Sequence, residues 1–510
     1  MKRISVVFIT LLMSLFLTEA STFEKKGFYV DCRHEVMTID ALKEYVSHLS
    51  KLGMNTLIME YEATFPFEKH ATLCNEYAFT KQEIEEFVAY CAALGVEVIP
   101  LQNCFGHAEY ILRHDRYAFM KELHGEYSQV CPMAPPAADD VFREIFEELA
   151  ALHPSKYFHI GADETRLLGR CPRCRKKVQE EGVSALFVDY VNRMADIVIS
   201  MGKTPIIWDD MLLQHPEALS RLREGIILLD WNYGWDVSRF GDINNLLNSD
   251  YELWGATAMR SHPDQIHVTQ WRKHLDNLTS YIPFAREAGF HAIINTSWST
   301  SGQYGFHYDG DFGRINNMQP IRSVFPQKGM NLLVEAFCSA VNDNGMFDAE
   351  SFVRRYAKEH FGFSAKDSDV LWAFINVYQD VVTGSGTDSR KQEIETLIQE
   401  MTEMQKQMYA MNPKYNADEF ADLVLMIDLR LDYLHFRRIE LQFNADSFDK
   451  EHAKSLYEVL TAHIDQSKYV GQRFVASCEG YLKKGQAETI DAERMEAKYH
   501  LLAVLKNMIR

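Results

Sequence analysis

Eight short apolar runs alternate with amphipathic helical patterns between residues 27 and 298 of this chain. Short runs of β-branched and aromatic residues, each followed by a helical period, predict parallel strands joined by helical crossovers. The expected strands are residues 28–32, 55–61, 96–101, a short run within 156–164, 203–208, 225–231, 251–257 and 291–298. Eight such units predict an α/β fold of the (β/α)8 TIM-barrel type. A doubly wound open sheet is disfavoured, because no Gly-x-Gly-x-x-Gly follows an early strand.

The strand signals stop near Asn342, and the rest of the chain has the periodicity of helices. The helical periods cover residues 349–360, 368–382, 392–411, 418–442, 451–482 and 492–509. We find no convincing internal repeat, which favours a helical domain over a solenoid. The predicted organisation is a catalytic barrel over residues 21–345 and an all-α domain over residues 346–510, with a flexible linker at 383–387.

Residues 1–20 have the pattern of a secretory signal peptide. Lys2 and Arg3 precede a mostly apolar run at residues 4–17, and the small residues Thr18 and Ala20 follow it. The run is too short for a stable spanning helix, although a retained membrane anchor is the alternative. We therefore expect a secreted or periplasmic protein that has no membrane partner after cleavage.

The chain is acidic, with a formal net charge of −19. This balance disfavours nucleic acid and anionic membrane surfaces as partners. It also argues against a strongly anionic polymer as substrate, unless a local basic patch overrides the overall charge.

The cysteines do not form the pattern of a disulfide framework. There are nine in 510 residues, and Cys171-Pro172-Arg173-Cys174 is the sole Cys-x-x-Cys sequence. A structural zinc site usually needs a second such pair or spaced histidines, and the sequence offers no second half. We expect a local disulfide or two free thiols at Cys171 and Cys174, and neither a metal nor another cofactor.

Two adjacent acids, Asp163 and Glu164, follow the fourth apolar run and the small residues Gly161 and Ala162. Neighbours on a regular strand point to opposite faces, so both acids can serve one site only if the strand ends or bends there. One carboxyl could then act as a general acid while its neighbour stays ionised beside a cationic centre. The alternative is that the pair simply caps the next helix.

Polar and aromatic residues gather where the predicted strands end, which is where the active site of such a barrel lies. They are Asp31, Arg33, Glu60, Glu62, Asn103, His107, Trp208, Asp209, Trp231, Tyr233, Trp235, Trp254 and Trp298. Aromatic walls with a few fixed polar groups suit the C–H faces of a sugar ring. The pattern therefore predicts a carbohydrate site.

The sequence His159-Ile160-Gly161-Ala162-Asp163-Glu164 resembles the His-x-Gly-Gly/Ala-Asp-Glu signature of the family 20 glycoside hydrolases, the β-N-acetylhexosaminidases. The likeness covers roughly residues 27–340. Residues 58–67 are more similar to the hexosaminidase D branch than to lysosomal-type members, and the small α/β domain that commonly precedes the barrel is not recognised before the first strand.

Several further residues resemble family positions. Arg33 is similar to the arginine that binds hydroxyls of the non-reducing sugar, and residues 105–107 to the family's Pro-Gly-His segment. From the resemblance and from their places at the strand ends, we expect eight residues to bind substrate: Arg33, His107, Trp208, Asp209, Trp231, Tyr233, Trp254 and Trp298. Many members place a Tyr-x-Asp pair after strand seven. Residues 253–257 lack it, and Tyr233 is the predicted substitute.

The resemblance implies an exo-acting, retaining enzyme that removes terminal β-linked GlcNAc or GalNAc with assistance from the substrate's own acetamido group. Glu164 would be the acid and later the base. Asp163 would accept the acetamido N–H bond and stabilise the positive charge, with His107 and His159 holding the carboxylates. The implied partners are glycans or glycoconjugates that contain N-acetylhexosamine.

Two other functions stay open at this point. One is a retaining glycosidase of another family, with Glu164 as acid and Asp209 or Glu60 as nucleophile. The other is a carbohydrate-binding barrel without activity. The second is disfavoured because a binding module has little use for two adjacent buried acids.

Overall fold

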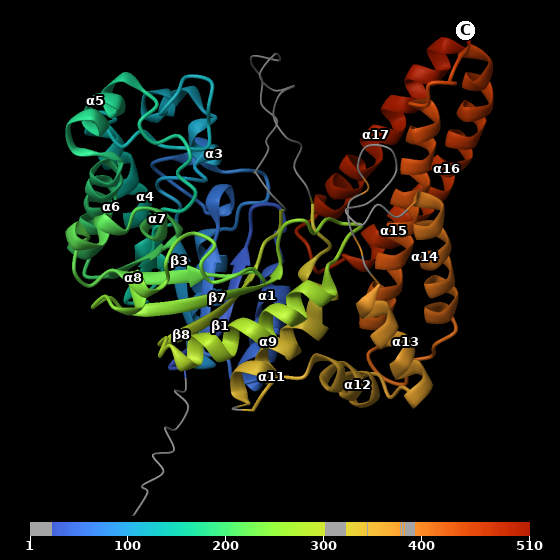
Figure 1. Cartoon of the computed structure of the whole chain (residues 1–510), viewed down its shortest axis with the longest axis horizontal. Coiled ribbons are helices and arrows are strands. Elements are labelled where there is room, and N and C mark those ends of the chain that lie inside the picture. Colours follow the sequence, from blue (N-terminus) through green and yellow to red (C-terminus); the bar gives the residue numbers. More distant parts are fainter. Residues whose placement is uncertain (1–22, 301–322, 344, 378, 380–381, 383–392) are drawn as a thin grey trace, which may run out of the picture.

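Eight parallel strands close into a barrel in which each strand pairs with its neighbours in chain order (Figure 1). The strands are β1 (Lys25–Asp31), β2 (Thr56–Glu60), β3 (Glu97–Leu101), β4 (Tyr157–His159), β5 (Thr204–Trp208), β6 (Ile227–Trp231), β7 (Leu253–Arg260) and β8 (Ala292–Ser297). Pairing of β1 with β8, from Lys25 opposite Ala292 to Val30 opposite Ser297, completes the ring. The predicted α/β barrel is confirmed.

The computed structural model describes residues 23–300, 323–343, 345–377, 379, 382 and 393–510. The expected signal peptide at residues 1–20 and the expected linker at 383–387 lie outside the described residues. Both stay predictions, as does the division between the two domains at residue 345.

Helices surround the barrel and return the chain from the end of one strand to the start of the next. They are α1 (Ile39–Lys51), α2 (Lys81–Ala93), α3 (Glu109–Leu112), α4 (Ala137–Leu152), α5 (Pro172–Glu181), α6 (Val183–Ser200), α7 (Asp210–Gln214), α8 (Asn244–Leu247), α9 (Trp271–Glu287) and α11 (Asn331–Asn342). Local sequence fixes where some of them begin. The Thr38 side chain caps α1, and Thr80 with Glu83 forms a capping box at α2.

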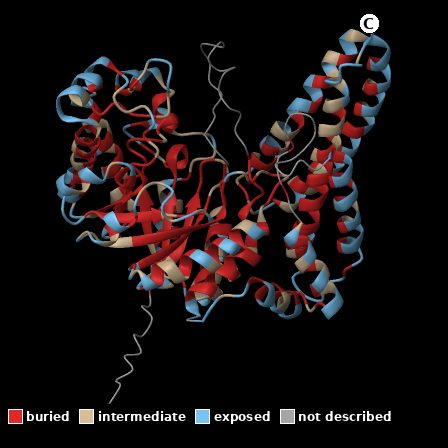
Figure 2. Ribbon diagram, viewed as in Figure 1, coloured by how far each residue is buried: buried red, intermediate tan, exposed pale blue. Residues whose placement is uncertain are grey.

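The strands separate two apolar layers, because successive side chains on a strand face opposite ways. In β1, Tyr29 packs inside the barrel with Ile58 and Ile99, whereas Phe28 and Val30 belong to the larger core between strands and helices. Buried residues accordingly concentrate in the strands in Figure 2.

The C-terminal part of the chain is helical, as predicted. Its helices are α12 (Ala349–His360), α13 (Ala365–Asn376), α14 (Ile394–Tyr409), α15 (Ala417–Phe443), α16 (Lys450–Ser477) and α17 (Gln486–Met508). The long helices α15 to α17 stand beside the barrel and project past it (Figure 1). Inside this bundle, the buried Asp432 carboxylate pairs with Arg494 and with Lys498 at 3.0 Å.

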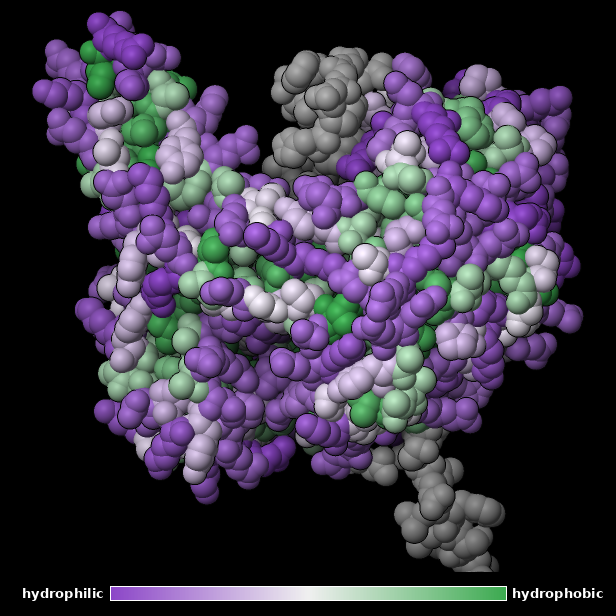
Figure 3. All heavy atoms as spheres, turned by 180° about the vertical axis from the view of Figure 1, so that it is seen from behind, coloured by the Kyte–Doolittle hydropathy of each residue, from purple (hydrophilic) through white to green (hydrophobic). Residues whose placement is uncertain are grey.

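The outer surface is mostly polar on the side seen in Figure 3, where hydrophobic residues are interspersed among hydrophilic ones. Within the described part of the chain, no helix has both the length and the apolar composition needed to cross a bilayer.

Two elements differ from the sequence-based expectation. Strand β7 runs to Arg260 instead of ending at residue 257, because it stays paired with β8 through a register shift between Ala258 and Arg260. The sequence pattern of residues 109–123 predicts one helix, but these residues form only the short α3 followed by the 3-10 turn η3 (Asp115–Met120). The chain then forms an isolated antiparallel bridge between Lys121 and Val130.

A buried ion pair joins the barrel to the chain that follows it. Arg260 at the end of β7 donates to Glu35, and both side chains are almost fully buried. The other oxygen of Glu35 accepts from the backbone N–H of Gln327 at 2.9 Å and from the Tyr481 hydroxyl at 3.1 Å. Glu35 therefore connects β7, the segment after β8 and the C-terminal helices.

We predict that Glu35→Ala lowers the free energy of unfolding by about 3–5 kcal/mol, because it leaves the Arg260 guanidinium buried without its partner. Urea denaturation of the full chain measures this loss. The matched control is Glu44→Ala, since Glu44 is exposed on α1 and its replacement should change stability by at most about 0.5 kcal/mol. Equal stability of the two variants would contradict the role given to Glu35.

Candidate active site

A cavity of about 690 Å³ opens at the carboxyl ends of the strands. The end of β5 and the segments after β1, β3, β4, β6, β7 and β8 contribute side chains to its wall. Among the residues predicted from sequence, those that line it are Arg33, His107, Asp163, Glu164, Trp208, Trp231, Tyr233 and Trp298. Asp209 and Trp254 do not.

The backbone bends sharply between the end of β4 and the two acids. Gly161, Ala162 and Glu164 have φ angles of 74°, 79° and 47°, in the left-handed region. Such angles are unfavourable for residues with a Cβ atom, so they persist only where the surrounding structure enforces them. The bend ends the strand alternation, and both Asp163 and Glu164 face the same cavity.

His107 lies between the two acids. Its Nε2 atom is 3.3 Å from Oδ2 of Asp163 and 3.4 Å from Oε2 of Glu164. Burial by itself would lower the pKa of His107, but the negative charge of Asp163 and the contacts with both carboxylates raise this pKa well above its usual value. His107 is therefore a partly buried imidazolium shared by two carboxylates.

The approach of His107 depends on a glycine. A Cβ atom on Gly106 would lie 2.2 Å from the backbone oxygen of Asp163. The loop after β3 can therefore reach the loop after β4 only with glycine at this position.

Glu164 has a second cationic neighbour, Arg166, whose Nη2 atom donates to Oε1 at 2.6 Å. Burial would raise the pKa of Glu164, but His107 and Arg166 outweigh it and lower this pKa to about 2. With these partners in place Glu164 is ionised. Its backbone N–H donates to Oδ2 of Asp210 at 3.1 Å, which fixes the bend from the side of α7.

One carboxylate oxygen of Asp163 is buried and has no hydrogen-bond partner among the described residues. Its residue surface is 8% exposed, and among the described residues its Oδ1 atom has no hydrogen-bond partner. Buried acceptors are normally paired, and an exception at a cavity wall is a candidate binding group.

Arg33 is held at the opposite side of the cavity by two acids beneath it. Its guanidinium bonds to Asp31 at 2.9 and 3.0 Å and lies 3.4 Å from Glu60, and it sits over the Trp298 ring at 5.3 Å. Burial raises the pKa of Glu60 to about 7 although Arg33 opposes the shift. Glu60 does not line the cavity, and it supports Arg33 instead.

Aromatic rings form the remaining wall. The ring centroids of Trp208 and Trp298 are 6.2 Å apart, and those of Trp231 and Tyr233 are 5.1 Å apart. The indole Nε1 of Trp298 donates to the Tyr233 hydroxyl at 3.2 Å. Behind Trp208, the buried His159 accepts from the Gly161 N–H at 3.0 Å, and burial lowers the pKa of His159 to about 3, so it is neutral.

Two of the residues predicted to bind substrate do not line the cavity. Trp254 is the second residue of β7 and lies at the far end of the barrel, where it packs on Tyr157 at 5.2 Å. The expectation failed because β7 continues well past it. Asp209 is fully buried beside Asp230, and burial and that neighbour raise the pKa of its carboxyl. It precedes α7, and the next residue, Asp210, makes the contact to the Glu164 backbone.

One side of the cavity is basic, and the sequence did not predict it. It is formed by Arg166, Arg239, His262 and Lys273, of which His262 follows the extended β7. The overall net charge of −19 does not predict this basic cluster, because its residues come from separate segments of the chain. Asn103, which donates to Glu60 at 2.5 Å, also lines the cavity and was recognised only as a residue at a strand end.

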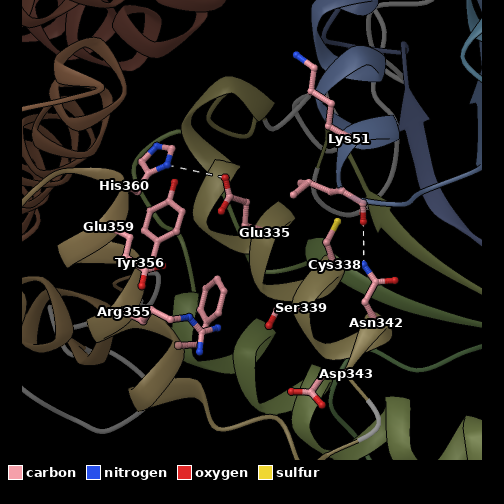
Figure 4. Close-up of a pocket in the computed structure, with 12 residues that line it drawn as sticks. Lys51, Glu335, Cys338, Ser339, Asn342, Asp343, Arg355, Tyr356, Glu359 and His360 are labelled. Atoms are coloured by element: carbon pink, nitrogen blue, oxygen red, sulfur yellow. Dashed lines mark hydrogen bonds and ion pairs between the residues drawn. The ribbon is translucent and has the colours of Figure 1, made fainter.

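A second cavity, of about 720 Å³, lies between α1, α11 and α12 (Figure 4). Its polar groups largely bond to one another: His360 lies 3.8 Å from Glu335, and Asn342 donates to the Leu52 carbonyl at 2.8 Å. These contacts hold α12 and α11 against the barrel. The cavity at the strand ends is therefore the better candidate for chemistry.

Comparison with known proteins gives a consistent result. Residues 23–253 match the family model described as "Glycosyl hydrolase family 20, catalytic domain". Hexosaminidase D of Homo sapiens is 29% identical over 307 residues, which cover 56% of this chain and 62% of that relative. Hexosaminidase D of Bos taurus is 29% identical over 274 residues, which cover 50% of this chain and 79% of that relative. The match to the human relative thus spans less than two thirds of its length.

Among solved structures, the chitobiase of Flavobacterium johnsoniae is similar, with a TM-score of 0.50 and 15% sequence identity. The alignment covers 96% of this chain and 73% of that one. At this identity the likeness shows the fold alone.

We predict that Gly106→Ala destabilises the protein by about 1–3 kcal/mol, because the new methyl group forces the loop of His107 away from the Asp163 carbonyl. Urea denaturation measures the loss. Gly345→Ala is the control, because Gly345 is exposed and the nearest atom to its Cβ position is the movable Asp343 carboxylate at 3.2 Å. If Gly106→Ala is as stable as this control, the two loops do not meet as closely as described.

Proposed function

Because this chain belongs to glycosyl hydrolase family 20, we propose that it is an exo-acting β-N-acetylhexosaminidase that removes terminal β-linked GlcNAc or GalNAc with retention of configuration. The observation that carries this proposal is the arrangement of Asp163 and Glu164, adjacent in sequence and bridged by His107 at the cavity wall. The substrates are glycans or glycoconjugates that end in an N-acetylhexosamine.

The reaction proceeds in two steps with the substrate as its own nucleophile. In the first, the acetamido carbonyl oxygen bonds to the anomeric carbon, the glycosidic C–O bond breaks, and Glu164 protonates the departing oxygen. Asp163 accepts a hydrogen bond from the acetamido N–H and stabilises the positive charge of the oxazolinium. In the second, Glu164 takes a proton from water as the water attacks the anomeric carbon. The unpaired Oδ1 of Asp163 supports its assignment.

The proton for the first step is stored on His107. With Arg166 at 2.6 Å, Glu164 is ionised, whereas His107 is charged. The Arg166 side chain is 63% exposed, so a substrate can displace it from Glu164 and exclude water at the same time. Both changes raise the pKa of Glu164. The proton then moves from Nε2 of His107 to Oε2 of Glu164, which are 3.4 Å apart before this rearrangement.

The rest of the cavity would hold the sugar. Arg33, preorganised by Asp31 and Glu60, can donate to ring hydroxyls. Trp208 and Trp298 offer apolar faces. The Tyr233 hydroxyl accepts from Trp298 and can donate its own proton to the acetamido oxygen.

The rival mechanism needs a second carboxylate at the cavity as nucleophile. Within the described residues, Asp163 and Glu164 are the only acidic side chains that line it. Asp209 is buried behind the wall, and Glu60 is engaged by Arg33, Tyr29 and Asn103. These contacts favour substrate assistance over either carboxylate.

We predict that the chain hydrolyses aryl 2-acetamido-2-deoxy-β-glycosides and is inactive on the matching 2-hydroxy glycosides, because only the former carry the nucleophile. Asp163→Asn should lower kcat by about 10²–10³-fold, as removal of a fixed transition-state contact does. It should also weaken binding of a thiazoline analogue of the intermediate more than binding of N-acetylglucosamine, since the analogue gains from the Asp163 charge.

The folded state of Asp163→Asn is checked by its unfolding midpoint, which should stay near that of the wild type. Equal cleavage of the 2-hydroxy glycosides would overturn substrate assistance. So would covalent labelling of any carboxylate by a 2-fluoro sugar.

The raised pKa of His107 determines the alkaline limb of the pH profile. Activity requires the proton on the His107–Glu164 pair, so kcat/KM should fall only as pH rises through that raised pKa, above the usual histidine value of about 6.5. His107→Gln removes this store of protons, and its alkaline limb should move to lower pH. His500→Gln, which changes an exposed histidine on α17, is expected to keep the wild-type profile. An unchanged limb in His107→Gln would contradict the proton store.

A further inference from the structure

Four buried side chains with metal-ligating atoms converge outside the cavity: Glu122, Cys131, Cys171 and Cys174. Their ligand atoms all lie within 4.8 Å of one another. Sγ of Cys131 is 3.6 Å from that of Cys171 and 3.5 Å from that of Cys174, and Cys174 Sγ is 3.1 Å from Oε2 of Glu122. We propose that these residues form a tetrahedral structural zinc site with three thiolate ligands and one carboxylate.

One half of the site is built at the start of α5. Cys171 is the N-cap of this helix, Pro172 occupies its first turn, and the backbone N–H of Cys174 donates to Cys171 Sγ at 3.3 Å. The helix N-terminus and its N–H donors favour negative charge, so they stabilise thiolates here.

The other half comes from the loop between η3 and α4. Glu122 and Cys131 follow the two residues of the Lys121–Val130 bridge, and Cys131 N–H donates to the Met120 carbonyl at 2.7 Å. Oε1 of Glu122 also accepts from the Cys171 N–H at 2.8 Å, which turns the carboxylate toward the cysteines. The two loops thus meet at these four side chains.

The donor set and spacing fit zinc. Three soft sulfurs with one carboxylate select zinc over magnesium or calcium. A tetrahedral ion with Zn–S bonds of about 2.3 Å places its sulfurs roughly 3.8 Å apart, close to the 3.5 and 3.6 Å observed. A disulfide would need about 2.05 Å. It would also join only two of the three sulfurs and leave the third beside the buried Glu122.

The surroundings fit a closed structural site. Leu186 packs with the three cysteines, and Leu168, Val178 and Ala134 cover the cluster. None of the four proposed ligands lines the cavity at the strand ends, so they leave no open position for a substrate. Three thiolates, a carboxylate and Zn²⁺ carry a net charge of −2, part of which is offset by Arg173, whose Nη2 is 3.7 Å from Cys131 Sγ.

The site would fix the segments that carry the two acids and His107. The loop from β4 to α5 begins after His159 and reaches Cys171, with Asp163, Glu164 and Arg166 between them. Its midpoint is tied to the other loop where the Leu167 N–H donates to Gln129 Oε1 at 2.7 Å. Both α3 and α5 lie on the same side of the barrel in Figure 1. Zinc would thus hold the loop after β4 against the one after β3, a structural role that does not depend on the proposed reaction.

The test is the zinc content of the full-length chain, purified without chelator and measured by inductively coupled plasma mass spectrometry. We expect close to one zinc ion per chain in the wild type. Cys131→Ser and Cys174→Ser should lose most of it. Cys91→Ser, at a buried cysteine on α2 that is not part of the cluster, should keep it. Removing the ion with a chelator should lower the unfolding midpoint, and adding Zn²⁺ should restore it.

A second measurement uses the wild type alone, so it remains informative if the serine variants fail to fold. Native alkylation followed by peptide mapping should show Cys131, Cys171 and Cys174 protected, and a chelator should expose all three to the reagent. A metal-free chain with a disulfide between two of these cysteines, seen as protection that a reductant removes and a chelator does not, would overturn the proposal. So would zinc that stays bound in both serine variants.

Discussion

Closure of the barrel by the ladder between β1 and β8 is the constraint on which the rest of the structure depends. It places Lys25 opposite Ala292 and Val30 opposite Ser297, so that the first and last strands end at the same rim. Groups nearly 270 residues apart in the chain then meet there: the Asp31 carboxylate, which positions Arg33, also accepts from the backbone N–H of Ser299 at 2.8 Å. Parallel pairing requires a crossover after every strand, which is why all these loops collect at one end.

Within that rim, the chemistry depends on a bend that costs conformational energy. Left-handed angles at Ala162 and Glu164 turn two sequence neighbours toward one cavity. The bend is held by Asp210 from one side and by His107, admitted by Gly106, from the other. In the proposed mechanism, the same contacts keep a proton on His107, between the two carboxylates, until a substrate replaces Arg166.

The proposed zinc site lies farther along the same loops, at the start of α5 and before α4. The β4 strand has only three residues, and the long segment that follows it has little regular structure before α5. A tetrahedral ion between Cys171, Cys174, Cys131 and Glu122 would anchor the end of this segment at the start of α5. Rigid loops suit the proposed reaction, in which Glu164 and Asp163 must keep their positions relative to the sugar.

The sequence by itself determined the repeating strand–helix units, hence the barrel, and it located the acid pair at a strand end. These features are local: apolar period, small residues before Asp163, and aromatic residues after the strands. The tertiary structure decided what depends on pairing between distant segments. β7 continues to Arg260 because it stays paired with β8. Trp254 therefore lies at the end of the barrel away from the cavity, and His262 lines the cavity. Asp209 is buried because α7 starts after it. Cys131 and Glu122 lie beside Cys171 and Cys174 in space, although about forty residues of chain separate Cys131 from Cys171. No local pattern carries that information, because a fold brings such groups together only after its loops have closed.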